Sequence, residues 1–129
     1  MCDVEFPAVD HSPEALRTRT KQFALRVMRL VRSLPNTAEA RVIGSQVLRS
    51  GTAIGANYRA AGRGRSRAEF AAKIGIVLEE ADETVYWLEL LVEGGVVAEK
   101  RMAALLQEAE ELVKIFAAMK GTLGNKRSR

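Results

Sequence analysis

Residues 66–95 read SRAEFAAKIGIVLEEADETVYWLELLVEGG, and this stretch decides the fold class. Its apolar residues recur three or four positions apart from Phe70 onward, which is the spacing of one face of an α-helix. Ser66 and Glu69 have the spacing of a capping box, in which each side chain bonds the other residue's amide at a helix start. Gly94 and Gly95 supply a C-terminal stop. The stretch therefore predicts a long amphipathic helix with its own start and end signals.

Two further helices are predicted upstream of this stretch. The first begins at Ser12-Pro13-Glu14, because a capping serine followed by proline suits a first turn. It ends at Pro35, since the residue before a proline leaves the helical region. The second begins near Thr37 and fades over residues 62–65, where glycine and arginine alternate.

A fourth helix is expected from about Ala98 to Lys120, with Gly121 and Gly124 ending it. Four amphipathic helices joined by short turns predict an all-α, up-down-up-down antiparallel four-helix bundle. We therefore expect a flexible lead-in over residues 1–11, the bundle over residues 12–121 and a basic tail over residues 122–129.

The bulk composition indicates one cytoplasmic domain of 129 residues without a membrane segment. Cys2 is the single cysteine, so no disulfide can form within the chain, and a reducing compartment is favoured. No apolar run approaches the roughly 18 residues that a membrane span needs. The first residues also lack the basic-then-apolar pattern of a signal peptide.

Charge is distributed unevenly along the chain. Residues 1–73 carry 13 basic and 6 acidic side chains, residues 74–120 carry 4 and 10, and residues 121–129 carry 3 and none. The formal net charge is +4. Such asymmetry is typical of a face that binds polyanions, but the basic and acidic parts can equally attract each other within or between subunits. Both interpretations stay open at this point.

Enzymatic chemistry finds little support in the residue types. A di-metal site in a helical bundle needs inward carboxylates with Glu-x-x-His motifs, whereas the only histidine is His11. The carboxylates that face each other best in this pattern are Glu80, Glu83, Glu108 and Glu111. Without a histidine base there is no familiar route to an activated serine, and residues 51–55 lack the lysine of a phosphate loop. We expect no enzyme, no metal and no cofactor.

Four glycines of the second helix form one stripe, spaced 7, 4 and 7 residues apart. They are Gly44, Gly51, Gly55 and Gly62. A glycine inside a helix costs about 1 kcal/mol relative to alanine, so four in register require compensation. Close approach of another helix, of the same chain or of a neighbour, is the interpretation favoured here. The alternative is that the helix breaks near Ser50-Gly51.

Arginines gather at the turn between the second and third helices. They are Arg59, Arg63, Arg65 and Arg67, and the first helix adds Arg26, Arg29 and Arg32. Guanidinium groups beside a helix N-terminus favour phosphate, and few aromatic residues accompany them, so contact with nucleic-acid backbone is expected rather than stacking on bases. The alternative is a merely solvated turn.

Apolar residues on the third helix exceed the one face that a bundle needs. The extra residues are Tyr86, Trp87, Leu90 and Val92. This excess predicts a subunit interface and hence a homo-oligomer.

The middle of the chain resembles a known family. The runs LRSGTAIGANYR (residues 48–59), SRAEFAAK (66–73) and EADETVYWLELL (80–91) are similar to bacterial four-helix-bundle proteins encoded by intervening sequences of 23S rRNA genes. The resemblance implies a ring-like homopentamer without known enzymatic activity. A related accessory protein of diversity-generating retroelements partners a reverse transcriptase and nucleic acid. Glu79 and Ala60 depart from the family's usual charges at their positions.

The polar residues of the matched runs suit a buried or interfacial network better than catalysis. They are Ser50, Asn57, Glu69, Lys73, Glu80 and Glu83. Our leading hypothesis is a non-enzymatic oligomeric scaffold that binds nucleic acid through its basic surface, with RNA favoured and DNA as the other candidate. The alternative is a protein-interaction module that meets an acidic protein partner, and a metal-dependent bundle enzyme is a remote third.

Overall fold

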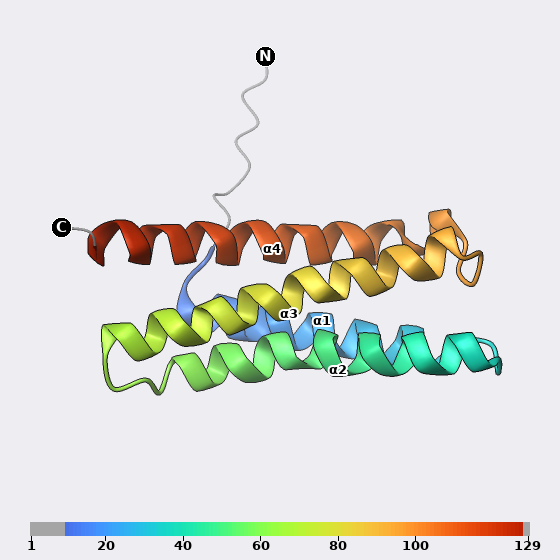
Figure 1. The fold of residues 1–129 in the computed structure, drawn as a ribbon, viewed down its shortest axis with the longest axis horizontal. Coiled ribbons are helices and arrows are strands. Elements are labelled where there is room, and N and C mark those ends of the chain that lie inside the picture. Colours follow the sequence, from blue (N-terminus) through green and yellow to red (C-terminus); the bar gives the residue numbers. More distant parts are fainter. Residues whose placement is uncertain (1–9, 128–129) are drawn as a thin grey trace, which may run out of the picture.

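Four α-helices make up the part of the chain that the computed structural model describes, residues 10–127, and that part contains no strand. They are α1 (Pro13–Arg32), α2 (Ala38–Ala61), α3 (Arg67–Glu93) and α4 (Glu99–Arg127). Each helix runs antiparallel to the next (Figure 1), so the predicted all-α four-helix bundle is confirmed. Most of the expected lead-in, residues 1–9, and the last two residues of the expected tail lie outside the described part.

The first three helices begin at the predicted caps. The side chains of Ser12, Thr37 and Ser66 each accept a hydrogen bond from the amide three residues further along, at 3.1–3.2 Å. Each bond satisfies an amide that has no partner inside its helix. At the other end of α3, Gly95 adopts a φ of 77°, a conformation that favours glycine, and the chain turns there.

The last helix does not end where the glycines predicted. It continues through Gly121 and Gly124 to Arg127. Leu123 explains this extension, because it continues the apolar stripe of α4 and is only 8% exposed. A helical glycine costs about 1 kcal/mol, which burial of a leucine side chain offsets at about 1.5–3 kcal/mol.

The glycines of α2 lie against α1, and α2 is continuous past Ser50-Gly51. A Cβ at Gly44 would lie 2.9 Å from Leu34 Cδ1, one at Gly51 would lie 2.9 Å from Val27 Cγ2, and one at Gly55 would lie 3.1 Å from Thr20 Oγ1. The structure therefore places these three glycines at a close helix–helix contact within the chain.

Gly62 does not share that contact. It caps the C-terminal end of α2, and a Cβ at this position would have the carbonyl oxygen of Arg59, in the same helix, as its nearest neighbour at 3.5 Å. The prediction that Gly62 belongs to the stripe was wrong, because α2 ends one residue earlier, at Ala61, and the spacing of the glycines does not reveal that end.

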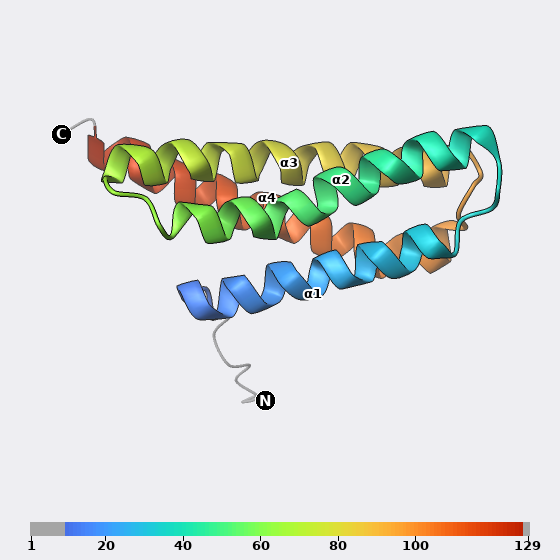
Figure 2. The ribbon, with the colours of Figure 1, turned by 90° about the horizontal axis from the view of Figure 1, so that it is seen from below.

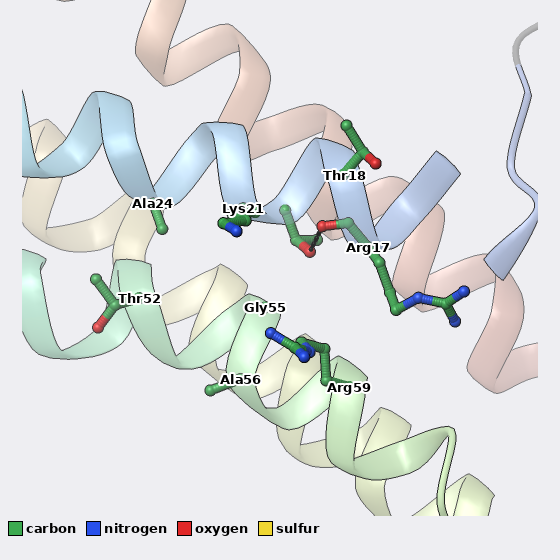
Figure 3. Close-up of a pocket in the computed structure, with 9 residues that line it drawn as sticks. Arg17, Thr18, Lys21, Ala24, Thr52, Gly55, Ala56 and Arg59 are labelled. Atoms are coloured by element: carbon green, nitrogen blue, oxygen red, sulfur yellow. Dashed lines mark hydrogen bonds between the residues drawn. The ribbon is translucent and has the colours of Figure 1, made fainter. Parts of the chain in front are cut away.

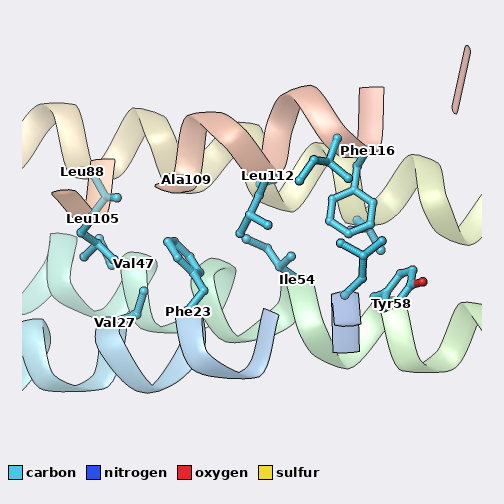
Figure 4. Packing of buried hydrophobic residues seen from close by; sticks show 14 of the residues in the cluster. Phe23, Val27, Val47, Ile54, Tyr58, Leu88, Leu105, Ala109, Leu112 and Phe116 are labelled. Carbon is cyan, nitrogen blue, oxygen red and sulfur yellow. The ribbon is translucent and has the colours of Figure 1, made fainter. Parts of the chain in front are cut away.

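The core runs the length of the bundle and draws on all four helices. Figure 4 shows Phe23 of α1, Ile54 of α2, Leu88 of α3 and Phe116 of α4 pointing into it. Tyr58 packs its ring against that of Phe116, with centroids 5.4 Å apart. None of the helices in residues 10–127 is both long and apolar enough to span a membrane.

Figure 2 shows α1 along one edge of the bundle and α3 along the opposite edge. The flanks of α1 are therefore bounded by α2 on one side and by α4 on the other. Both flanks carry basic residues, and they form the candidate site.

Candidate nucleic-acid interface

The arginines among the described residues divide into those that pair with carboxylates and those that do not. Arg19 of α1 makes a two-pronged ion pair with Glu108 of α4, with nitrogen–oxygen distances of 2.7 and 2.9 Å. The hydrogen bond to Glu108 raises the pKa of the Arg19 guanidinium above its usual range. Arg49 of α2 is likewise paired, with Glu80 at 3.2 Å and with Glu83. These two arginines tie helices together and leave little charge for a ligand.

Ion pairs account for the four carboxylates that were considered as metal ligands. Glu80 and Glu83 face Arg49, Glu108 faces Arg19, and Glu111 lies 3.4 Å from Lys114, so each carboxylate lies beside a cation of its own chain. Within residues 10–127, no three or more histidine, cysteine, aspartate or glutamate side chains converge in a way that would hold a metal ion.

The predicted arginines of the turn between α2 and α3 are all exposed. Arg63 and Arg65 lie in the turn itself, Arg67 is the first residue of α3, and Arg59 lies in the last turn of α2. None of the four forms an ion pair with a described residue. The turn presents guanidinium groups to solvent, which is compatible both with phosphate binding and with a merely solvated turn.

The start of α3 is less open to anions than expected. Glu69 places its carboxylate on the amide of Arg65 at 3.3 Å, while the Ser66 hydroxyl accepts from the amide of Glu69. The capping box is therefore shifted: the carboxylate bonds the amide before Ser66 and not that of Ser66 itself. Since the chain's own carboxylate already faces this helix end, the anion-binding capacity of the turn rests on its arginines.

A basic groove lies between α1 and α2, and we call it the α1–α2 groove (Figure 3). Its volume is about 440 Å³. It is lined by Arg17, Thr18, Thr20, Lys21, Ala24, Thr52, Gly55, Ala56 and Arg59. Among the residues that the structure describes, the charged ones in this lining are all cations, and no carboxylate is part of it.

The figure shows where the cations of the α1–α2 groove point. The Lys21 ammonium lies at the edge of α1 that faces α2, and the Arg59 guanidinium lies along α2 beside Gly55, whereas Arg17 extends toward the N-terminal end of α1 (Figure 3). Thr20 donates to the Leu16 carbonyl at 2.8 Å and Thr52 to the Leu48 carbonyl at 2.7 Å, while the Thr18 side chain points away from α2 (Figure 3). Charge recognition in this groove therefore rests on Arg17, Lys21 and Arg59.

The structure separates Arg59 from the turn cluster to which the sequence assigned it. Arg59 joins Arg17 and Lys21, which sequence reasoning missed. Arg17 and Lys21 are four residues apart and so share one helix face. A signal was present in the sequence, because Gly55 lies one turn before Arg59 and marks where α1 approaches.

A second basic groove lies on the other flank of α1, and we call it the α1–α4 groove. It has a volume of about 310 Å³ and an apolar floor of Leu30, Met102 and Leu105. The predicted residues Arg26 and Arg29 line it together with Arg101 of α4, which sequence reasoning did not single out. Arg101 also donates to the Ser33 hydroxyl at 2.6 Å. The described charged residues of this groove, too, are all cations.

Tyr58 lies close to the α1–α2 groove but belongs to the core. It is 5% exposed, and burial raises the pKa of its hydroxyl above the ordinary value of 10.0, while the positive charge of Arg17 opposes that rise. The tyrosine therefore stays neutral at physiological pH and adds no charge to the groove.

The aromatic residues predicted at a subunit interface lie on the surface of α3. Tyr86 is 53% exposed and its ring meets that of Trp87 edge-on, with centroids 5.0 Å apart. Trp87 is half-buried and donates from Nε1 to Glu83 at 3.0 Å. The pair forms an exposed aromatic shelf beside the Arg49 ion pairs.

The polar residues of the matched runs are only partly a network. Ser50 and Thr84 are fully buried between α2 and α3, with their hydroxyl oxygens 2.8 Å apart. Asn57, in contrast, donates to the carbonyl of Ala53 in its own helix at 2.9 Å.

These features define the class of protein: a small helical bundle whose edge helix carries a cationic groove on each flank. Comparison with known proteins makes the assignment specific. A model of the 23S rRNA-intervening sequence protein family matches residues 16–118. The chain belongs to this family, as the sequence resemblance indicated.

A solved structure is similar over most of the chain. It is a protein of unknown function from the S23 ribosomal protein family of Bacteroides thetaiotaomicron, at 35% sequence identity and a TM-score of 0.78. The match covers 84% of this chain and 97% of the other. No curated protein matches this chain.

Proposed function

We propose that the protein is a non-enzymatic oligomeric scaffold that binds nucleic acid, RNA in preference to DNA, through the phosphate backbone. The binding surface is α1 with its two grooves, extended by the arginines of the turn between α2 and α3. Backbone contacts of this kind position a strand without reading its sequence.

The observation that carries the proposal is that no carboxylate among residues 10–127 lines either groove, in a chain with 16 acidic residues. If the basic residues served only to balance the acidic half, ion pairs would be expected along α1. Only Arg19 of that helix forms one with a described residue. Each cation without a partner can displace a counterion from a phosphate, which is the main source of affinity in such complexes.

Assembly into a homo-oligomer would multiply these contacts. The exposed aromatic shelf of Tyr86 and Trp87 lies on α3, on the edge opposite α1 (Figure 2), so self-association through α3 would leave the grooves free. A pentamer is favoured by the family resemblance. Every subunit of a symmetric ring presents the same basic surface, which raises avidity for a long strand.

The test is binding to a generic single-stranded RNA as a function of salt. The logarithm of the affinity should fall against the logarithm of salt concentration with a slope of about −0.7 per phosphate contact. Changing Arg26 and Arg29 together to alanine should flatten the slope and weaken binding to all sequences alike. Arg63→Ala with Arg65→Ala should do the same, since both side chains are exposed and unpaired.

The matched control removes the same charge elsewhere. Arg41→Ala with Lys100→Ala changes two exposed residues that line neither groove, and should leave the slope unchanged. If the unaltered protein binds neither RNA nor DNA at about 50 mM salt, where screening is weak, the proposal is wrong. Binding to an acidic protein under those conditions would then favour an interaction module instead.

A further inference from the structure

We infer that the α1–α2 groove is a distinct site for a phosphomonoester, either the terminal phosphate of a nucleic acid or that of a free mononucleotide. Along the rest of the basic surface, the proposed function needs only internal phosphodiesters. If the phosphomonoester is the end of a nucleic acid, the inference rests on the proposed function. If it belongs to a free mononucleotide, the inference does not depend on that function.

Charge is the first argument. Arg17, Lys21 and Arg59 line one groove, and none of them has an ion-pair partner among the described residues. A phosphomonoester carries about −1.5 to −2 charges at pH 7 and three acceptor oxygens, whereas a phosphodiester carries a single charge. Lys21 and Arg59, with Arg17 at the end of the groove nearest the start of α1, therefore favour the monoester over the diester.

The positions of the cations fit a small anion better than an extended strand. Lys21 and Arg59 come from the two helices that flank the groove, and both line it (Figure 3). An anion held there is approached from two sides. In the turn between α2 and α3, by contrast, Arg63, Arg65 and Arg67 project from one short segment into solvent.

The floor of the groove leaves room for more than a phosphate. Ala24, Gly55 and Ala56 line it with minimal side chains, and its volume of about 440 Å³ is within the range of about 300–1,000 Å³ typical of small-molecule sites. A sugar or the face of a base can lie on such a surface while the phosphate meets the cations. The α1–α4 groove differs, because its volume is smaller and its floor consists of the larger side chains Leu30, Met102 and Leu105.

The experiment uses three probes: adenosine monophosphate, a short RNA with a 5′-phosphate, and the same RNA with a 5′-hydroxyl. Amide chemical shifts should move at Ala24, Thr52, Gly55 and Ala56 when the nucleotide is added. The phosphorylated RNA should bind about tenfold more tightly than its hydroxyl counterpart, the effect of roughly one additional charge-assisted hydrogen bond.

Two variants assign these effects to the groove. Lys21→Ala with Arg59→Ala should abolish both the nucleotide shifts and the preference for the phosphorylated end. Ala56→Leu should do the same with every cation in place, because it fills the groove from an exposed helical position that tolerates leucine. Arg41→Ala with Lys100→Ala, a matched loss of two positive charges, should change neither.

The outcomes separate this inference from the proposed function. Nucleotide shifts in the groove without RNA binding support the site and refute the nucleic-acid function. A 5′-phosphate preference that both groove variants abolish supports the site, with the nucleic-acid end as its source. Equal binding of the two RNAs together with no nucleotide shifts overturns the inference, even if the salt-dependent binding of RNA is strong.

Discussion

The contact between Gly51 and Val27 makes the sharpest test of the packing between α1 and α2. Gly51→Ala adds one methyl group to α2 at a point where its carbon would lie 2.9 Å from Val27 Cγ2 and 3.1 Å from Val27 Cγ1. Val27 is fully buried, and its branched side chain has one preferred rotamer in a helix, so it cannot turn aside. Accommodating the methyl group requires the two helices to move apart.

Two opposing effects set the change in folding stability that Gly51→Ala causes. Alanine is more favourable than glycine inside a helix by about 0.5–1 kcal/mol, whereas overpacking a filled core costs about 1–3 kcal/mol. Gly121 provides the matched control, because it lies inside α4 and a Cβ added there would have no atom of the described residues within 4 Å apart from its chain neighbours and the nearby backbone of α4. Gly121→Ala should therefore stabilise the fold by about 0.5–1 kcal/mol, and Gly51→Ala should be less stable than that control by about 1–3 kcal/mol.

Thermal unfolding at one fixed protein concentration measures this difference, since self-association makes Tm depend on concentration. A free-energy difference of 1 kcal/mol shifts Tm by about 4 °C for a domain of this size. In the Val27→Ala background, Gly51→Ala should become stabilising, because the obstructing atoms are gone. If Gly51→Ala raises Tm as much as Gly121→Ala does, the inference that Gly51 and Val27 are too close to admit a methyl group is wrong.

Two further predictions concern the tyrosines. Tyr86→Lys should lower the molar mass measured by light scattering at micromolar concentration without unfolding the helices, because it puts a charge on the exposed aromatic shelf. If the mass of the variant stays at the same multiple of 14.2 kDa, α3 is not the interface between subunits. If the unaltered protein is monomeric, the proposed homo-oligomer is wrong. Tyr58 has a raised pKa in the folded state, so the stability that its neutral form contributes is present below pH 10 and is lost as pH rises above that value. Tyr58→Phe should therefore unfold less steeply with rising pH above 10, and an unchanged pH profile would contradict the burial argument.

The helices were predictable because their signals are local. A serine or threonine cap and a spacing of three or four residues act within one or two turns, and the first three helix starts fell on the predicted residues. The end of α4 was missed because the glycine signal is also local, whereas burial of Leu123 depends on how α4 packs against the rest of the bundle. Gly62 was misplaced for the same reason, since spacing alone does not reveal which side of a helix end a residue lies on.

The candidate site was predictable only where its residues lie near each other in the sequence. The arginines of the turn between α2 and α3 were found by their density. Lys21 and Arg59 are 38 positions apart, and Arg29 and Arg101 are 72 apart, so only the packing of the helices brings each pair to one groove. Nor could the sequence show that Arg19 is held by Glu108 while its neighbours on α1 remain free.

Gly55 contributes both to the packing of α1 against α2 and to the lining of the proposed binding groove. A Cβ there would lie 3.1 Å from Thr20 Oγ1 and 3.3 Å from Thr20 Cβ, so the glycine permits the approach of α1 to α2 at this level. The same residue is part of the floor of the α1–α2 groove, one turn from Arg59. Because Lys21 follows Thr20 directly, the distance between the two helices at Gly55 also sets the distance between the cations of Lys21 and Arg59. A larger residue would therefore cost packing energy and move the charges apart, which gives this glycine two independent reasons to be small.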